Sequence, residues 1–282
     1  MTSDTATLER PWKKWLGTGT LMFVVLIVAV PVTWMALTSF KSNAEIGQQG
    51  TVLPANWTFD NYHRLFAERY FGPYLRNTLL IASASVIVSL VIGTLAAYSL
   101  ARFPLWRGLE RRLGFGILTV RILPPIVIAV PIFLLALKAG LINSRFGLII
   151  VYSAFNVSFV VWMMEGFFRE IPVDLEEASM VDGSSRMAAF RRIVLPLAAP
   201  GLVATSIFAV IVTYNEFLLA LVLTSTPDAQ TVPVGTSSLI GRISVDVGAM
   251  AAAGCIAAIP IAIFALIVQR HLVRGLTLGA VK

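Results

Sequence analysis

Charged residues are scarce in this chain: Asp, Glu, Lys and Arg make up 13% of its 282 residues, where a soluble domain has about 25%. Hydrophobic residues account for 57%, and the mean hydropathy is +0.82. Such a composition excludes an ordinary soluble domain, and no compact basic domain is present to bind nucleic acid. The composition therefore predicts a membrane protein.

Residues that carry catalysis are also scarce. Cys255 is the only cysteine, which excludes an internal disulfide and favours a small buried hydrophobic residue. His63 and His271 are the only histidines, and the chain contains neither a His-Glu-x-x-His nor a Gly-x-Ser-x-Gly motif. A Gly-x-x-x-x-Gly-Lys-Ser/Thr loop for nucleotide phosphates is absent as well. These absences argue against a membrane-embedded enzyme, a metal site and ATP hydrolysis by this chain.

Six apolar runs are each long enough to cross about 30 Å of hydrocarbon as a helix. Lipid offers no hydrogen-bond partners to the backbone, so runs this continuous form helices rather than the alternating strands of a barrel. The runs lie at 16–38, 75–100, 114–137, 146–168, 200–224 and 248–269. We therefore predict an all-α, polytopic membrane protein with six transmembrane helices.

The distribution of Lys and Arg predicts the topology. With the N-terminus inside, 14 of these 22 residues fall in inside segments and seven in outside loops, so both termini are expected in the cytoplasm. The run at 16–38 is too long for a signal peptide and is expected to be an uncleaved anchor. The expected parts are a cytoplasmic N-terminal segment 1–15, a membrane domain 16–269 with an external loop 39–74 and a cytoplasmic loop 169–199, and a cytoplasmic tail 270–282.

The external loop contains a short amphipathic pattern. Thr58 can cap a helix whose apolar residues share one face: Tyr62, Leu65, Phe66 and Tyr70. One interpretation is an interfacial helix with its aromatic residues at headgroup level. The other is a contact surface for an external partner.

The cytoplasmic loop has the pattern of two short helices joined by a turn. Pro172 suits a first helical turn, and Gly183 is where the helix can end in a left-handed conformation. The acidic residues near the expected helix start are Asp174, Glu176 and Glu177. Ser184 can begin a second helix, which Pro196 would stop. The small residues Ala178, Ser179 and Gly183 allow a neighbouring backbone to approach, as at a docking surface. An ordinary connecting loop with well-formed caps is the alternative.

This loop resembles the signature of the permease subunits of binding-protein-dependent ABC importers. That signature is Glu-Ala-Ala, three residues, Gly, nine residues, then Ile-x-Leu-Pro, and here Ser179 replaces the second alanine. In that family the motif forms a coupling helix that docks in a cleft of the ATP-hydrolysing subunit. The resemblance implies the following coupling residues: Glu176, Glu177, Ala178, Ser179, Asp182, Gly183, Ile193, Leu195 and Pro196.

Two further segments are similar to the maltose-type carbohydrate branch of that family. The tail 272–282 looks like the C-terminus of its six-span permeases, without their closing glycine, and Tyr214-Asn215-Glu216-Phe217 is similar to its Trp-Asn-Glu/Asp-Phe. The resemblance implies the type I ABC importer permease fold and alternating-access transport of a disaccharide, oligosaccharide or polyol. A related importer of glycerol phosphate and a secondary active transporter are the alternatives, although no internal repeat supports the latter.

The resemblance also implies a complex in the bacterial cytoplasmic (inner) membrane. Its other members would be two ATPase subunits, a second and different permease subunit, and an external sugar-binding protein. ATP and Mg would bind to the ATPase subunits, and this chain would be a non-catalytic subunit with no cofactor of its own.

Charged residues inside a membrane are costly and are functional candidates. We expect Arg121 and Glu165 to form ion pairs with residues on facing helices. Tyr214, Asn215 and Glu216 form a polar patch in the fifth run, which favours either a solute pathway or hydrogen bonds between helices. The prolines of the third and sixth runs are expected to make fixed bends: Pro124, Pro125, Pro131 and Pro260.

Overall fold

The computed structural model describes residues 11–47, 51–103, 109–241 and 245–279. These residues are mostly helical and include no β-strand, so the expected helical class is confirmed. The chain divides into two compact units, one of residues 1–69 with 241–256 and one of residues 70–240 with 257–282. Each unit is described by itself.

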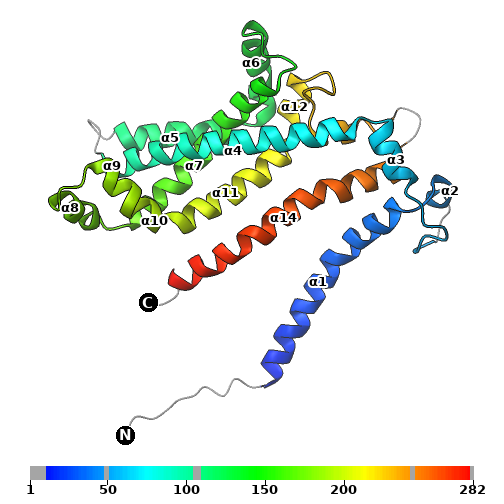
Figure 1. The fold of residues 1–282 in the computed structure, drawn as a ribbon, viewed down its shortest axis with the longest axis horizontal. Helices are drawn as coiled ribbons and strands as arrows, with labels where there is room; N and C mark the ends of the chain where they lie inside the picture. Colours follow the sequence, from blue (N-terminus) through cyan, green and yellow to red (C-terminus); the bar gives the residue numbers. More distant parts are fainter. Residues whose placement is uncertain (1–10, 48–50, 104–108, 242–244, 280–282) are drawn as a thin grey trace. The chain divides into compact units, whose positions relative to one another are not determined.

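The first unit contains α1 (Pro11–Ser39), α2 (Asn43–Ile46), α3 (Asp60–Ala67) and the beginning of α14 (Val247–Gly279) (Figure 1). In α3, Leu65 is fully buried and Phe66 is 47% exposed. The helix ends at Ala67, so Tyr70 lies beyond it, and the expectation that Tyr70 shares a face of this helix is wrong. The helix begins just after Thr58, whose hydroxyl accepts a hydrogen bond from the Asp60 amide at 3.1 Å.

Asn61 fixes α3 to the end of α1 within this unit. Its buried side-chain amide donates to the carbonyl oxygens of Ser39 (2.9 Å) and Lys41 (2.8 Å) and accepts a hydrogen bond from Arg64 (2.7 Å). A Cβ atom at Gly248 would lie 2.4 Å from the Asn61 Oδ1. Only glycine permits this close approach at the start of α14.

Glu45 organises the segment after α1. Its Oε1 accepts hydrogen bonds from the amides of Ala55 (2.8 Å) and Asn56 (3.1 Å), and its Oε2 accepts one from the amide of Ser42 (3.2 Å). Burial alone would raise the pKa of Glu45, but the hydrogen bonds outweigh burial and hold this pKa below its ordinary value.

The lowered pKa of Glu45 predicts an acid-sensitive loop. A carboxyl group with a depressed folded-state pKa stabilises the fold above its unfolded pKa of about 4.3 and loses that contribution as the pH falls through the folded value. We expect the exchange protection of the Ala55 and Asn56 amides, corrected for intrinsic rates, to fall below about pH 4. Glu45→Gln should remove this pH dependence; an unchanged acid transition in that variant would contradict the assignment.

The second unit has α4 (Phe71–Arg102) and α7 (Arg145–Glu170) packed along each other, with α11 (Ala199–Tyr214) against both (Figure 1). Gly93 on α4 permits this contact, since a Cβ atom there would lie 2.7 Å from the Val160 side chain of α7. Around this core the unit also contains α5 (Leu109–Ile122), α6 (Pro125–Lys138), α8 (Asp174–Val181), α9 (Arg186–Ala189), η2 (Phe190–Val194), α10 (Leu195–Leu197), α12 (Leu218–Leu223) and α13 (Val232–Ser237).

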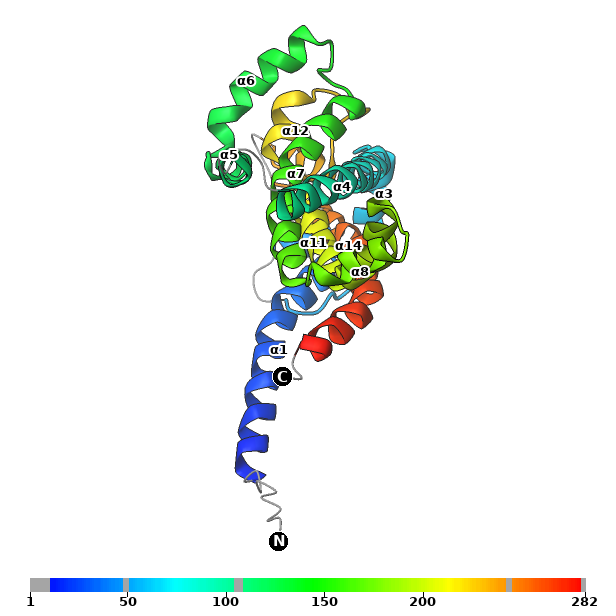
Figure 2. The same ribbon diagram turned by 90° about the vertical axis from the view of Figure 1, so that its left-hand side faces the viewer.

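Among the described residues, four helices are long and apolar enough to span a membrane: Gly17–Ser39, Phe71–Arg102, Arg145–Glu170 and Val247–Gln269. The expected third span is instead two helices, α5 and α6, which run in different directions on either side of Leu123 and Pro124 (Figure 1, Figure 2). Pro124 has ψ of 130°, because a residue that precedes proline is driven out of the helical region. The expected bend at Pro124 is thus a break, whereas Pro131 and Pro260 lie inside helices.

The expected fifth span is also interrupted. The helix α11 ends at Tyr214, and α12 begins at Leu218 after a break at residues 215–217. Before α11, the chain bends by 72° between Arg186–Leu197 and Ala199–Tyr214. If the two sides of that bend together count as one span, the described residues contain up to five candidate spans by length and composition.

Candidate functional sites: a two-helix loop and a polar pocket

Residues 169–199, the two-helix loop, contain α8, α9, η2 and α10. The helix α8 begins at Asp174, two residues after the expected Pro172, and ends at Val181; Gly183 follows in the turn, with φ of +90°. The Ser184 amide donates to the Ser179 carbonyl and the Gly183 amide to the Met180 carbonyl, both at 3.0 Å. This pair of hydrogen bonds is a Schellman motif, which confirms the expected left-handed turn at Gly183.

The second half of the loop differs in detail from the expectation. Ser185, rather than Ser184, caps α9 by accepting a hydrogen bond from the Ala188 amide at 3.3 Å. Pro196 does not stop the helix; it occupies the first turn of α10, where its missing N–H is not needed, and the bend follows at Ala198.

The signature residues of the loop differ in exposure. Five of them are exposed to solvent: Glu177, Ala178, Asp182, Gly183 and Pro196. Ser179, Ile193 and Leu195 are half-buried. Val181, in the same helix as Ala178 and Ser179, is 87% exposed. The outer side of α8 and its turn is therefore available to a partner.

Glu176 lies on the inner side of α8 and is only 4% exposed. Its carboxylate accepts hydrogen bonds from the Tyr98 hydroxyl (2.6 Å) and the Arg102 Nε (2.5 Å). Both donors lie near the end of α4. In this chain Glu176 is thus committed to internal contacts.

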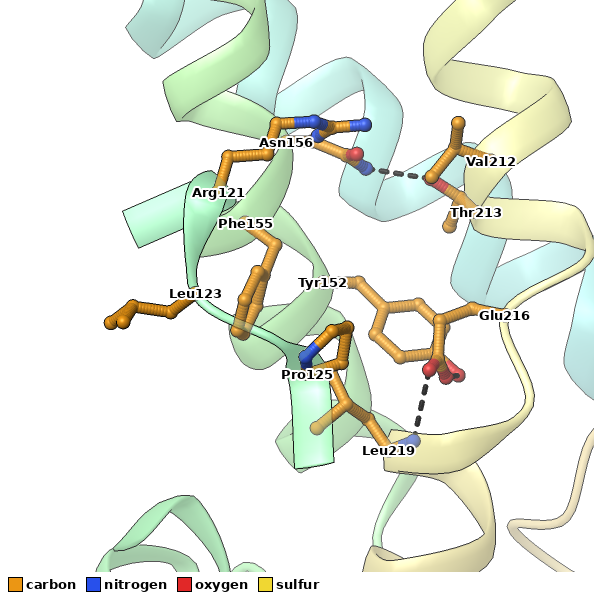
Figure 3. Close-up of a pocket in the computed structure, with 10 residues that line it drawn as sticks. All are labelled: Arg121, Leu123, Pro125, Tyr152, Phe155, Asn156, Val212, Thr213, Glu216 and Leu219. Atoms are coloured by element: carbon orange, nitrogen blue, oxygen red, sulfur yellow. Dashed lines mark hydrogen bonds between the residues drawn. The ribbon is translucent and has the colours of Figure 1, made fainter. Parts of the chain in front are cut away.

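A pocket of about 290 Å³ lies among α5, α6, α7, α11 and α12. Figure 3 shows Arg121, Asn156 and Thr213 at one end of the pocket and Tyr152 with Glu216 further along it. The remaining lining is apolar: Leu123, Pro125, Phe155, Val212 and Leu219. An apolar cavity with a few converging polar groups is the usual form of a small-molecule site.

Glu216 stands in the break between α11 and α12. Its Oε2 accepts hydrogen bonds from the Tyr152 hydroxyl of α7 (2.6 Å) and the Ala220 amide (3.2 Å), and its Oε1 accepts one from the Leu219 amide (2.9 Å). The carboxylate therefore satisfies two free N–H groups at the positive start of α12. It also joins α7 to α12, so Glu216 makes a hydrogen bond between helices, as one of the two interpretations of the polar patch expects.

The other two residues of the expected solute pathway do not line the pocket. The Tyr214 side chain is buried and donates a hydrogen bond to the Ala257 carbonyl of α14 at 2.8 Å. Asn215 is exposed and donates to the Ile211 carbonyl of its own helix at 2.8 Å. Tyr152 and Asn156, which do line the pocket, were not anticipated. Their spacing of four residues on one face of the fourth apolar run is the sequence signal for them.

Arg121 does not form the expected ion pair with a described residue. Its guanidinium lies over the rings of Phe159 (4.9 Å) and Phe208 (6.0 Å), an arrangement that stabilises a cation through the ring quadrupole. No hydrogen bond links it to the part of the chain that the structure describes, so its donors remain available in the pocket. Glu165 does form an ion pair, but with Arg169 of its own helix (2.6 Å) rather than across helices.

The sequence and fold are similar to those of known transport proteins. The family model described as "Binding-protein-dependent transport system inner membrane component" matches residues 89–278. The chain is 38% identical to the trehalose transport system permease protein SugB of Mycobacterium tuberculosis, over 92% of this chain and 94% of that protein. It is 35% identical to the diacetylchitobiose uptake system permease protein DasC of Streptomyces coelicolor, over 94% of this chain and 95% of that protein.

A solved structure extends the similarity to the fold. A chain of a bacterial ABC transporter involved in the import of the acidic polysaccharide alginate matches 95% of this chain and 99% of its own length, with a TM-score of 0.77 and 24% identity.

Proposed function

This chain belongs to the family of binding-protein-dependent inner-membrane transport components, and we propose that it is the permease subunit of an ABC importer for a disaccharide, oligosaccharide or polyol. The observation that carries the proposal is the exposed α8 and its turn at Gly183, which bear the family signature. Similarity along nearly the whole chain to permeases named for trehalose and diacetylchitobiose supports the sugar class.

We propose six membrane crossings with both termini in the cytoplasm. The helices α5 and α6 together make the third crossing, and α11 with α12 makes the fifth. Broken spans are common where transporters line a water-filled path, since the freed backbone groups then meet water or polar side chains. The position of Glu216, which hydrogen-bonds the start of α12, supports this arrangement.

The exposed two-helix loop supports an ATPase subunit as a partner. Glu177, Ala178, Asp182 and Gly183 would dock on an ATPase subunit, one of two, that binds ATP and Mg. A second permease subunit would complete the membrane pathway, and an external binding protein would deliver the solute. Closure of the ATPase subunits on ATP would move the loop and open the spans outward.

We place the solute pathway at the pocket, with Glu216 as the one expected pathway residue that lines it. Sugars present many hydroxyl groups, and Asn156, Thr213 and the carboxylate of Glu216 can hydrogen-bond to them. The free donors of Arg121 also favour a second candidate, an anionic solute such as glycerol phosphate, because guanidinium groups bind phosphate well.

Uptake by a deletion strain tests the function. We expect loss of this chain to abolish the uptake of one labelled solute from a panel of trehalose, diacetylchitobiose, maltose and glycerol phosphate, and the intact gene to restore it. The panel distinguishes the sugar from the phosphate candidate. Normal uptake of every solute in the panel would contradict both.

A further inference from the structure

Glu176 is the buried member of an otherwise exposed acidic turn. Asp174 and Glu177 in the same turn of α8 are exposed and can interact with the positive helix start. Glu176 is not needed for that purpose, and burying its charge is costly unless it is paired and hydrogen-bonded. The burial of Glu176 therefore indicates that its carboxylate binds specific partners within the chain.

Two donors on α4 hold the Glu176 carboxylate against the end of that helix. Tyr98 and Arg102 lie one helical turn apart, and each donates to a different oxygen, at 2.6 and 2.5 Å. Arg102 also donates through Nη2 to the carbonyl oxygen of Ile171, the residue that follows α7, at 2.8 Å. The side chains of Arg102 and Glu176 are each 5% exposed. This cluster of Tyr98, Arg102 and Glu176 is called the clamp below.

Aromatic rings shield the clamp from water. The Tyr98 ring contacts Phe168 of α7 at 5.7 Å and Phe190 of η2 at 4.5 Å, measured between ring centroids. Because water is excluded, the charged hydrogen bonds are stronger and more directional than on a surface. Four elements, α4, α7, α8 and η2, thus meet at one rigid point.

We propose that the clamp transmits movement of α8 to α4, and that Glu176 is a positioning residue for coupling rather than a contact to the ATPase subunit. The proposal rests on the proposed function, in which a partner moves the outer side of α8. The covalent chain links α8 only to α7 and α9, through the exposed Pro172 and Val173 on one side and the Gly183 turn on the other. The clamp adds a direct connection to α4, a helix that packs against both α7 and α11 in the core of the unit.

The first test measures the connection itself. Hydrogen exchange of α8 amides in the purified complex should be faster in Glu176→Gln than in the wild type, by about tenfold or more, since a loss of 1.4 kcal/mol in opening free energy corresponds to tenfold. Glu165→Gln is the matched control, because it removes an ion pair of similar length that is more exposed and local to α7. Unchanged α8 exchange in Glu176→Gln would overturn the clamp whatever the chain transports.

The second test measures whether the coupling of ATP hydrolysis to import depends on the clamp. In proteoliposomes with the complete complex and binding protein, we expect Glu176→Gln to lower the number of solute molecules imported per ATP hydrolysed by about tenfold, while ATP hydrolysis continues. The double variant Glu176→Gln/Arg102→Met removes both charges and so relieves the unpaired buried arginine. It should remain uncoupled, because the charged bonds to α4 are still missing.

Two results would overturn the role in coupling. One is a wild-type import ratio in Glu176→Gln despite faster α8 exchange. The other is a double variant that recovers the wild-type ratio, which would mean that the pair serves only local stability. If the wild-type complex itself imports solute without ATP, the proposed function fails instead, and the exchange result still decides whether the clamp exists.

Discussion

Replacing Gly183 with leucine is expected to leave the complex assembled and hydrolysing ATP while uptake falls by at least about tenfold, the equivalent of 1.4 kcal/mol. A Cβ atom at Gly183 would meet no other described residue of this chain within 4 Å. The internal cost is therefore limited to the φ of +90°, where a residue other than glycine costs roughly 1–2 kcal/mol. A loss of uptake larger than this backbone strain explains must come from a partner that approaches the turn closely.

Two variants separate the backbone cost from the partner contact. Gly183→Ala carries much of the same backbone strain with a side chain of one carbon, so it should lose much less uptake than Gly183→Leu. Gly140→Leu is the matched control, because Gly140 also has a positive φ (+67°) and open space around its Cβ. Gly140 follows α6, in a loop that we expect outside the membrane on the opposite face. Equal losses in Gly140→Leu and Gly183→Leu, measured as uptake per assembled complex, would assign the effect to strain alone.

Replacing Glu216 with alanine is expected to abolish most uptake and to destabilise the region around the pocket. The change leaves the Leu219 and Ala220 amides and the Tyr152 hydroxyl without their acceptor. A partly buried group left without its partner costs about 1–3 kcal/mol, so the start of α12 should fray. Uptake of the labelled solute and thermal unfolding of the purified complex measure the two effects.

The neighbouring position provides the control for Glu216. Asn215 is adjacent in sequence but exposed, outside the pocket and bonded only within α11, so Asn215→Ala should change uptake by less than about twofold. Glu216→Gln keeps the size of the side chain and loses its charge. Normal uptake by Glu216→Gln, together with normal stability, would remove Glu216 from the solute pathway and leave it a purely structural role.

The two-helix loop was largely predictable because its signals are local. A glycine at a left-handed turn and acidic residues at a helix start act within one or two turns of chain, so α8 and the turn at Gly183 that follows it can be predicted from the sequence. The start of the helix was displaced by two residues, since Pro172 remains just outside it. Errors of one or two residues are expected when a helix boundary is predicted from residue propensity alone.

The inward direction of Glu176 was not predictable from the loop, because it depends on distant partners. Arg102 precedes Glu176 by 74 positions in the chain and Tyr98 precedes it by 78. The break at Pro124 could have been predicted from the sequence, because the second proline of a Pro-Pro pair disfavours the helical conformation at the first. Hydrophobicity across 114–137 is nevertheless continuous, and a run of apolar residues does not distinguish one helix from two. Arg121 was misassigned because a cation in an apolar setting can be stabilised by aromatic faces as well as by an acid.

The most direct measurement is mass spectrometry of what co-purifies with the tagged chain after gentle detergent extraction from its native membrane. We expect an ATPase subunit, a second and different permease subunit and, with solute present, an external binding protein. A chain that purifies alone, or only with copies of itself, and that imports solute without ATP would contradict the assignment as an importer permease and would favour a secondary active transporter.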